Sequence, residues 1–205
     1  MTFVKICGIT NRNDARMAAG AGADAVGMIF AESRRRVNMM RAREIADFLI
    51  PEDIKLVGVF VNESPERVVN IAREVGLDLV QLHGDEPPEE VAYLRSRSLK
   101  VMKAFRVKDK DSITRLDDYE ADFFLLDAFS EKARGGTGET FDWDAAKALV
   151  GRANIVVSGG LNPDNVAEAI EFFAPYGVDA SSSLEDAPGE KNAEMVRRFV
   201  SAAKG

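Results

Sequence analysis

The sequence alternates between short β-type segments and longer helical segments along its whole length, and this alternation limits the fold more than any other feature. Runs of β-branched and other apolar residues are typical of buried strands, whereas apolar residues spaced three and four positions apart indicate helices. We interpret the pattern as eight strand–helix pairs. The expected strands span residues 3–7, 24–30, 55–61, 77–82, 100–105, 121–127, 154–158 and 177–181. The expected helices span residues 11–19, 38–49, 64–75, 87–97, 109–116, 142–150, 162–173 and 190–203.

Helix start signals and the regular repeat length support this interpretation. Ser64-Pro65 and Asn162-Pro163 each place a capping residue before a proline at the first helical position. The repeat is roughly 25 residues long, close to the minimum for a strand, a helix and two short loops. Eight uninterrupted units favour a closed barrel over an open doubly wound sheet, which more often has fewer strands. We therefore expect an α/β fold with a single (βα)8 TIM-barrel domain over residues 1–205.

The composition argues against several classes of protein. With 46% hydrophobic and 30% charged residues the chain is typical of a soluble globular protein, and no apolar run approaches the ~20 residues of a membrane span. The first residues lack the pattern of a secretory signal, and the single cysteine cannot form an internal disulfide, so we expect a cytoplasmic protein. The formal net charge of −7 argues against a nucleic-acid partner. We find no spaced ligand cluster for a metal and no nucleotide-binding fingerprint.

Two loops that follow the last two expected strands are rich in glycine and serine. Gly159 and Gly160 come after the seventh strand, and Ser181 and Ser182 come after the eighth. Chemistry in a barrel occurs on the loops that follow the strands, and these two positions commonly bind phosphate through backbone N–H groups and hydroxyls. Tight turns would explain each loop alone, but their joint position favours a phosphate site.

The longest loop contains a further glycine-rich segment, Arg134-Gly135-Gly136-Thr137-Gly138, after the sixth expected strand. Glycine permits positive φ and close backbone approach, which suits a loop that folds over a ligand. A surface turn would explain the same segment.

Two reactive side chains end the first and sixth expected strands. Asp127 terminates an apolar strand, so its carboxyl group would be partly desolvated and could act as a general acid. Alternation places Cys7 on the same side of its strand as Lys5, whose charge could favour the thiolate. On position alone, an inert buried cysteine and a loop-capping aspartate remain alternatives. In an eight-stranded barrel the two strands are three neighbours apart, so the side chains would face each other across the mouth, a geometry that suits an isomerase.

Basic side chains near the expected mouth could bind the substrate. Arg34-Arg35-Arg36 follows the second strand, and a guanidinium can hold a carboxylate through two parallel hydrogen bonds. We expect two of the three arginines in solvent. His83, the only histidine, follows the fourth strand and could contact substrate or stabilise its own loop.

A set of motifs runs in order along the whole chain: KICGIT at 5–10, DAVGMIF at 24–30, VGVFVNES at 57–64, QLHGDE at 81–86, LLDAF at 125–129, GGTGETFDW at 135–143, SGGLNPDNV at 158–166 and GVDASS at 177–182. In combination they resemble the phosphoribosylanthranilate isomerase family of tryptophan biosynthesis. The resemblance implies an Amadori rearrangement of N-(5-phosphoribosyl)anthranilate to 1-(2-carboxyphenylamino)-1-deoxy-D-ribulose 5-phosphate, without cofactor or metal. We expect a small phosphosugar as the partner and a monomer or homodimer as the assembly.

The resemblance also implies roles for individual residues. It makes Cys7 the general base and Asp127 the general acid. An arginine after the second strand would hold the anthranilate carboxylate, and the family's spacing selects Arg35, with Arg36 in reserve. The phosphate would lie on the amides and hydroxyls of Gly159, Gly160, Ser181 and Ser182.

Three departures from the family and two other interpretations stay open. Ser183 replaces a usual glycine, Arg36 replaces a usual aromatic residue, and Asn38-Met39-Met40 replaces a Ser-Pro helix start. A related phosphosugar barrel is one alternative, but indole-glycerol-phosphate synthase should show a catalytic lysine and glutamate and a longer N-terminus, and the histidine-pathway isomerase an aspartate in place of Cys7. A non-catalytic or differently specific phosphosugar-binding barrel, or a flavin-binding one, is the other. A pure binder would need neither Cys7 nor Asp127.

Overall fold

Eight parallel strands close into a barrel in the computed structural model, which describes residues 1–128 and 143–205. Each strand pairs with the next along the chain, and β8 pairs with β1. The strands are β1 (Phe3–Cys7), β2 (Ala25–Ile29), β3 (Lys55–Phe60), β4 (Leu79–Leu82), β5 (Val101–Val107), β6 (Phe123–Ala128), β7 (Ile155–Val157) and β8 (Gly177–Ala180). Each observed strand lies on an expected one, so the predicted (βα)8 fold is confirmed.

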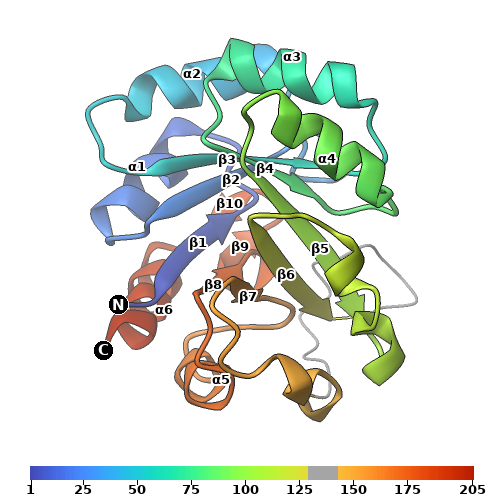
Figure 1. The fold of residues 1–205 in the computed structure, drawn as a ribbon. Coiled ribbons are helices and arrows are strands. Elements are labelled where there is room, and N and C mark those ends of the chain that lie inside the picture. Colours follow the sequence, from blue (N-terminus) through green and yellow to red (C-terminus); the bar gives the residue numbers. More distant parts are fainter. Residues whose placement is uncertain (129–142) are drawn as a thin grey trace.

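Helices surround the barrel and pack against its outer face (Figure 1). They are α1 (Arg12–Gly20), α2 (Met39–Leu49), α3 (Pro65–Val75), α4 (Pro88–Ser96), α5 (Val166–Phe173) and α6 (Ala193–Lys204). The helix α3 begins as predicted, with Ser64 as the N-cap residue and Pro65 in the first turn. In place of the usual Ser-Pro start, Asn38 caps α2 by accepting a hydrogen bond from the backbone N–H of Arg41. Although Asn38-Met39-Met40 differs from the family's usual Ser-Pro start, the helix still forms there.

Four of the predicted helices differ from the structure. The segments expected as helices at 109–116 and 142–150 form 3-10 helices, η1 (Lys110–Ile113), η2 (Leu116–Asp118) and η3 (Trp143–Leu149). The helix expected from 162 begins at Val166, because the Asn162 side chain accepts a hydrogen bond from the N–H of Asp164 and closes a turn instead. The last helix begins at Ala193 rather than 190, since β10 (Glu190–Lys191) pairs with β9 (Glu185–Ala187) as an antiparallel hairpin.

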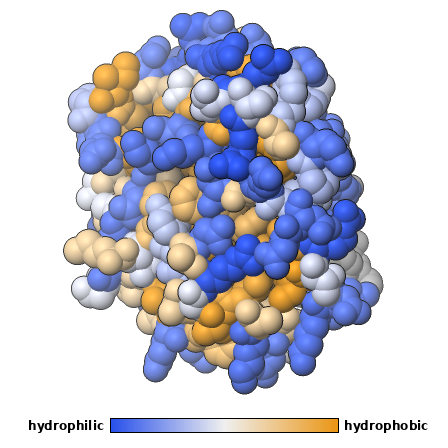
Figure 2. Space-filling view, viewed as in Figure 1, coloured by the Kyte–Doolittle hydropathy of each residue, from blue (hydrophilic) through white to orange (hydrophobic). Residues whose placement is uncertain are grey.

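The apolar core has two parts, one inside the barrel and one between the strands and the helices. Period-two alternation sends successive residues of each strand to opposite sides, and both sides are buried in a parallel barrel. The interior cluster contains Ala25, Val57, Leu79, Met102, Ala104, Leu125 and Val156. Outside this core, hydrophilic residues cover most of the face shown in Figure 2. Within residues 1–128 and 143–205, no helix is both long and apolar enough to cross a membrane.

The two ends of the chain lie next to each other (Figure 1). Lys204 of α6 donates a hydrogen bond to Asp24 Oδ1 at 2.9 Å, and Asp24 Oδ2 accepts the backbone N–H of Val4 at 2.7 Å. The last helix is thereby fastened to the first strand.

Candidate active site

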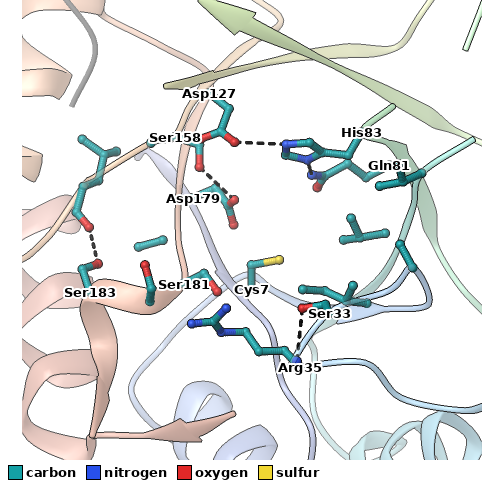
Figure 3. Close-up of a pocket in the computed structure, with 18 of the residues that line it drawn as sticks. Cys7, Ser33, Arg35, Gln81, His83, Asp127, Ser158, Asp179, Ser181 and Ser183 are labelled. Carbon is teal, nitrogen blue, oxygen red and sulfur yellow. Dashed lines mark hydrogen bonds and ion pairs between the residues drawn. The ribbon is translucent and has the colours of Figure 1, made fainter. Parts of the chain in front are cut away.

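A cavity of about 560 Å³ lies at the carboxyl end of the strands, where the sequence predicted the site. It is lined by every predicted site residue except Arg36: Cys7, Arg35, His83, Asp127, Gly159, Gly160, Ser181 and Ser182. The glycine-rich segment Arg134–Gly138, predicted to fold over the ligand, lies outside the described residues. Figure 3 shows Cys7 of β1 and Asp127 of β6 around a common space with Arg35 and His83, which come from the loops after β2 and β4.

Cys7 is the last residue of β1, and its surroundings require glycine on two sides. Gly8 has φ +78°, and a Cβ there would lie 2.7 Å from Cδ of Arg35 and 2.9 Å from Oγ of Ser181. Gly27 of β2 pairs with Cys7, and a Cβ there would lie 2.8 Å from the Cys7 sulfur and 3.1 Å from Lys5 Nζ. Glycine at both positions therefore lets charged and polar side chains approach the thiol.

The charge on Cys7 is governed by burial and by Lys5. Burial raises the pKa of the thiol, and the nearby Lys5 ammonium opposes this rise. Lys5 is fully buried and donates a hydrogen bond to Asp179 Oδ1 at 2.8 Å. Burial alone would lower the pKa of Lys5, but the charges of Asp179 and Cys7 raise it to about 12. Lys5 thus favours the thiolate of Cys7, as predicted. Burial has the larger effect, so the pKa of Cys7 is raised overall.

Asp127 is the last residue but one of β6 and is held from two sides. It is 4% exposed, more deeply buried than the partly desolvated position expected from the sequence. Its Oδ2 lies 3.0 Å from Nε2 of His83, and its Oδ1 accepts the N–H of Ala128 at 3.0 Å. His83 Nδ1 lies 2.8 Å from the amide nitrogen of Gln81. With the amide donating to Nδ1, a neutral His83 carries its proton on Nε2 and donates it to Asp127. The histidine therefore contacts the predicted acid directly.

The loops after β7 and β8 meet at one side of the cavity. Gly159 and Gly160 have φ values of +78° and +70°, and a Cβ at Gly159 would collide with the backbone nitrogen of Ala128. The hydroxyl of Ser183 donates to the carbonyl of Leu161, so one loop is tied to the other. Ser183 therefore links the two loops predicted to bind phosphate.

Arg35 and Arg36 occupy different environments. The Arg35 guanidinium lines the cavity and pairs with Glu185, whose hydrogen bonds raise the pKa of Arg35 above its ordinary value. Arg36 is exposed, and its backbone forms a bridge with Ile29 at the end of β2. The geometry favours Arg35 as the arginine that a ligand in the cavity would contact.

Several polar residues of the site were not identified from the sequence. Asp179 accepts hydrogen bonds from Lys5 at 2.8 Å and from the hydroxyl of Ser158 at 3.1 Å. Gln81 is 1% exposed, and its Oε1 is buried without a hydrogen-bond partner among the described residues. Both lie on predicted strands. The alternation of side chains along a strand, which directs every second residue into the barrel, could have identified them. In the described ranges no group of three His, Cys, Asp or Glu side chains is placed to hold a metal ion.

A thiol, a carboxyl group and an arginine around one cavity at the mouth of a (βα)8 barrel define an enzyme of the TIM-barrel class. The family model for N-(5'-phosphoribosyl)anthranilate (PRA) isomerase matches residues 4–202. The chain belongs to this family, and the resemblance inferred from the sequence is confirmed.

Individual relatives resemble the chain over its full length. The N-(5'-phosphoribosyl)anthranilate isomerase of Rubrobacter xylanophilus is 61% identical over 206 residues, covering 100% of both chains. The crystal structure of phosphoribosyl anthranilate isomerase from Thermotoga maritima is 42% identical, with a TM-score of 0.93 and 100% of each chain covered. A phosphoribosyl anthranilate isomerase in complex with reduced 1-(o-carboxyphenylamino)-1-deoxyribulose 5-phosphate is 40% identical, with a TM-score of 0.85 and the same coverage of 100%.

Proposed function

We propose that the chain catalyses the Amadori rearrangement of N-(5'-phosphoribosyl)anthranilate to 1-(2-carboxyphenylamino)-1-deoxy-D-ribulose 5-phosphate in tryptophan biosynthesis. The observation that carries this proposal is that Cys7 from β1 and Asp127 from β6 line one cavity together with the loops after β7 and β8. The cavity offers a proton acceptor, a proton donor and an anion site to a single small phosphosugar. Membership of the family supports the same reaction.

The proposed chemistry uses Asp127 and Cys7 in sequence. Asp127 donates its proton to the furanose ring oxygen, the bond from C1 to that oxygen breaks, and the ring opens to a Schiff base. The Cys7 thiolate then removes the proton from C2, and the electron pair of that bond neutralises the iminium nitrogen to give an enolamine. Tautomerisation of the enolamine gives the ketose. Substrate and product are isomers, so proton transfers suffice, and general acid–base catalysis is the matching mechanism.

Arg35 would bind the carboxylate of the anthranilate. A guanidinium carries five N–H donors in a planar fork. Glu185 takes the donors on Nε and Nη2, and the N–H groups of Nη1 do not take part in that pairing. Ile29 and Val59, from the neighbouring strands β2 and β3, line the same cavity and supply an apolar wall for the aromatic ring.

The phosphate would bind where the loops after β7 and β8 meet. Gly159, Gly160, Ser181 and Ser182 line this side of the cavity, and small residues bring backbone N–H groups and hydroxyls close to an anion. We further propose a cytoplasmic location, since the single cysteine is free and buried, and a monomer or homodimer as the assembly.

Substitution of the acid and the base tests the proposed function. We expect Cys7→Ala and Asp127→Asn each to lower kcat by roughly 10²–10⁴-fold, the usual contribution of a general acid or base. The fluorescence of N-(5'-phosphoribosyl)anthranilate should decay on addition of the wild type and only slowly with either variant. Thermal unfolding of both variants provides the control for folding. Unchanged emission with the wild type, or full activity in both variants, contradicts the mechanism.

A further inference from the structure

We propose that Glu185 and Lys191 are positioning residues that hold the Arg35 guanidinium in the orientation that binds the substrate carboxylate. The inference rests on the proposed function, because the carboxylate-binding role of Arg35 belongs to it. Neither Glu185 nor Lys191 is among the described residues that line the cavity, so both would act through Arg35.

The contact between Arg35 and Glu185 fixes the plane of the guanidinium. Nε of Arg35 lies 2.8 Å from Oε1 and 2.9 Å from Oε2 of Glu185, and Nη2 lies 2.7 Å from Oε2. A carboxylate bound along this edge restricts rotation of the guanidinium about its long side chain. The N–H groups of Nη1, on the other edge of the guanidinium, are thereby held in one orientation.

Lys191 fixes Glu185 in turn. Its Nζ lies 2.7 Å from Oε1 of Glu185 and donates to the carbonyl of Ser181 at 3.0 Å. The side chains of Arg35, Glu185 and Lys191 are 15%, 3% and 0% exposed. The hydrogen bonds from Arg35 and Lys191 outweigh burial and lower the pKa of Glu185, so this carboxyl group is ionised at neutral pH. A buried carboxylate between two cations has little freedom to move.

The hairpin formed by β9 and β10 presents these two residues. Glu185 and Lys191 are register partners in its antiparallel pair, and the backbone N–H of Lys191 donates to Asp14 of α1 at 3.0 Å. The hairpin thus connects the loop after β8 to the first helix. Its position explains how a segment after the last barrel strand can brace an arginine that follows β2.

The contacts of Glu185 and Lys191 that hold Arg35 would lower the entropic cost of binding. An arginine side chain that is ordered before the ligand arrives loses less conformational freedom on binding. Two cations and one anion leave the cluster with one net positive charge, so it still attracts a carboxylate. The opposite interpretation is that Glu185 competes with the substrate for Arg35, and it predicts the opposite change in KM when Glu185 is removed.

A charge-balanced double variant tests the proposal. Glu185→Gln combined with Lys191→Met removes one negative and one positive charge, so the net charge of the cluster is unchanged. The variant loses the hold on Arg35 and also the Lys191 hydrogen bond to the Ser181 carbonyl, whose effect the second substrate below measures. We expect KM for N-(5'-phosphoribosyl)anthranilate to rise about tenfold with little change in kcat, because uniform binding is lost. KM for N-(5'-phosphoribosyl)aniline, which lacks the carboxylate, should be unchanged.

Two results would overturn the proposal. An unchanged or lower KM for the carboxylate substrate would show that Glu185 does not orient Arg35. An equal rise for both substrates would show a structural effect, for example on the Ser181 loop. If the double variant does not fold, Glu185→Gln alone decides by the same two-substrate comparison. Titration with reduced product analogues, with and without the carboxylate, gives the comparison as dissociation constants and needs no turnover.

Matched arginine variants separate this proposal from the proposed function. Arg35→Ala should raise KM only for the carboxylate substrate, and the double variant should add nothing in that background. Arg36→Ala, an exposed arginine of the same loop, is the control and should change KM less. If Arg35→Ala affects both substrates equally, or the wild type leaves the substrate unchanged, the proposed function fails. The analogue titration still measures the effect of Glu185 and Lys191.

Discussion

The Cys7 thiol is subject to two opposing influences at the scale of a single residue. Burial raises its pKa, whereas the Lys5 ammonium lowers it and Asp179 raises it again. A general base must be deprotonated, so the thiolate population depends on the balance between Lys5 and Asp179. Both residues come from strands that meet only when the barrel closes, β1 and β8.

Removal of the Lys5 charge and removal of the Asp179 charge should shift the pKa of the Cys7 thiol in opposite directions. We expect Lys5→Met to raise the pKa of Cys7 and Asp179→Asn to lower it, because each substitution removes one of these two charges. The rate of alkylation by iodoacetamide, measured against pH, reports the thiolate. The double variant Lys5→Met/Asp179→Asn removes a buried pair together and is the control for folding. A midpoint that moves the same way in both single variants contradicts the electrostatic account.

The sequence predicted those site residues whose position follows from a local pattern. Cys7 and Asp127 lie at the carboxyl ends of apolar strands, and the glycines and serines follow strands, so the barrel topology alone brings them to one mouth. Glu185 could not be found in this way, because it pairs with Arg35 at a separation of 150 residues. No short-range pattern specifies a partner so distant. Lys191 was also hidden, since its segment was interpreted as the start of the last helix.

The elements differ in how far their sequences determine them. The eight strands were predicted closely, because strong apolar runs bounded by turn residues are unambiguous when they repeat. The segments after β5 and before β7 form 3-10 helices in place of the predicted α-helices. At η1 the Asp109 and Ser112 side chains form a capping box around a single 3-10 segment. At α5, the Asn162 side chain accepts the N–H of Asp164 and closes a turn, so the helix begins four residues later, at Val166.

Ser183 connects the loops after β7 and β8, and its substitution tests how this connection affects anion binding. In Ser183→Gly the loop after β8 loses its hydrogen bond to Leu161. We expect the inhibition constant of inorganic phosphate to rise severalfold, consistent with about 1 kcal/mol for one hydrogen bond. Ser183→Thr retains the hydroxyl and should restore the wild-type constant. Equal or tighter phosphate binding by Ser183→Gly would show that the link does not shape the site.

The stability of the whole molecule should depend on pH through the same buried groups. Lys5 has a pKa raised from 10.5 to about 12 in the folded chain, and that of Cys7 is raised from 9.0. A group with a raised pKa stabilises the fold fully below its unfolded value and loses that contribution as the pH rises through its folded value. For Lys5 the contribution is ~2 kcal/mol. Both groups therefore predict a loss of stability in alkali.

Urea unfolding at a series of pH values measures this dependence. We expect the free energy of unfolding to fall from about pH 9 upward, first through Cys7 and then through Lys5 above pH 10.5. Cys7→Ala should show a shallower fall between these two values. A free energy that stays constant to pH 11, or the same slope in Cys7→Ala, contradicts the assignment.

The register between β1 and β8 makes a buried ion pair depend on closure of the barrel. Lys5 and Asp179 are direct partners in that register and also form the buried ion pair. Burial of Lys5 is therefore favourable only once β8 has paired with β1, because a lysine without its counter-ion resists burial. Contacts of such long separation form late in folding. Asp179 thus reaches Lys5 and Cys7 of β1 only where β8 has paired with β1, so the electrostatic surroundings of the thiol are complete only in the closed barrel.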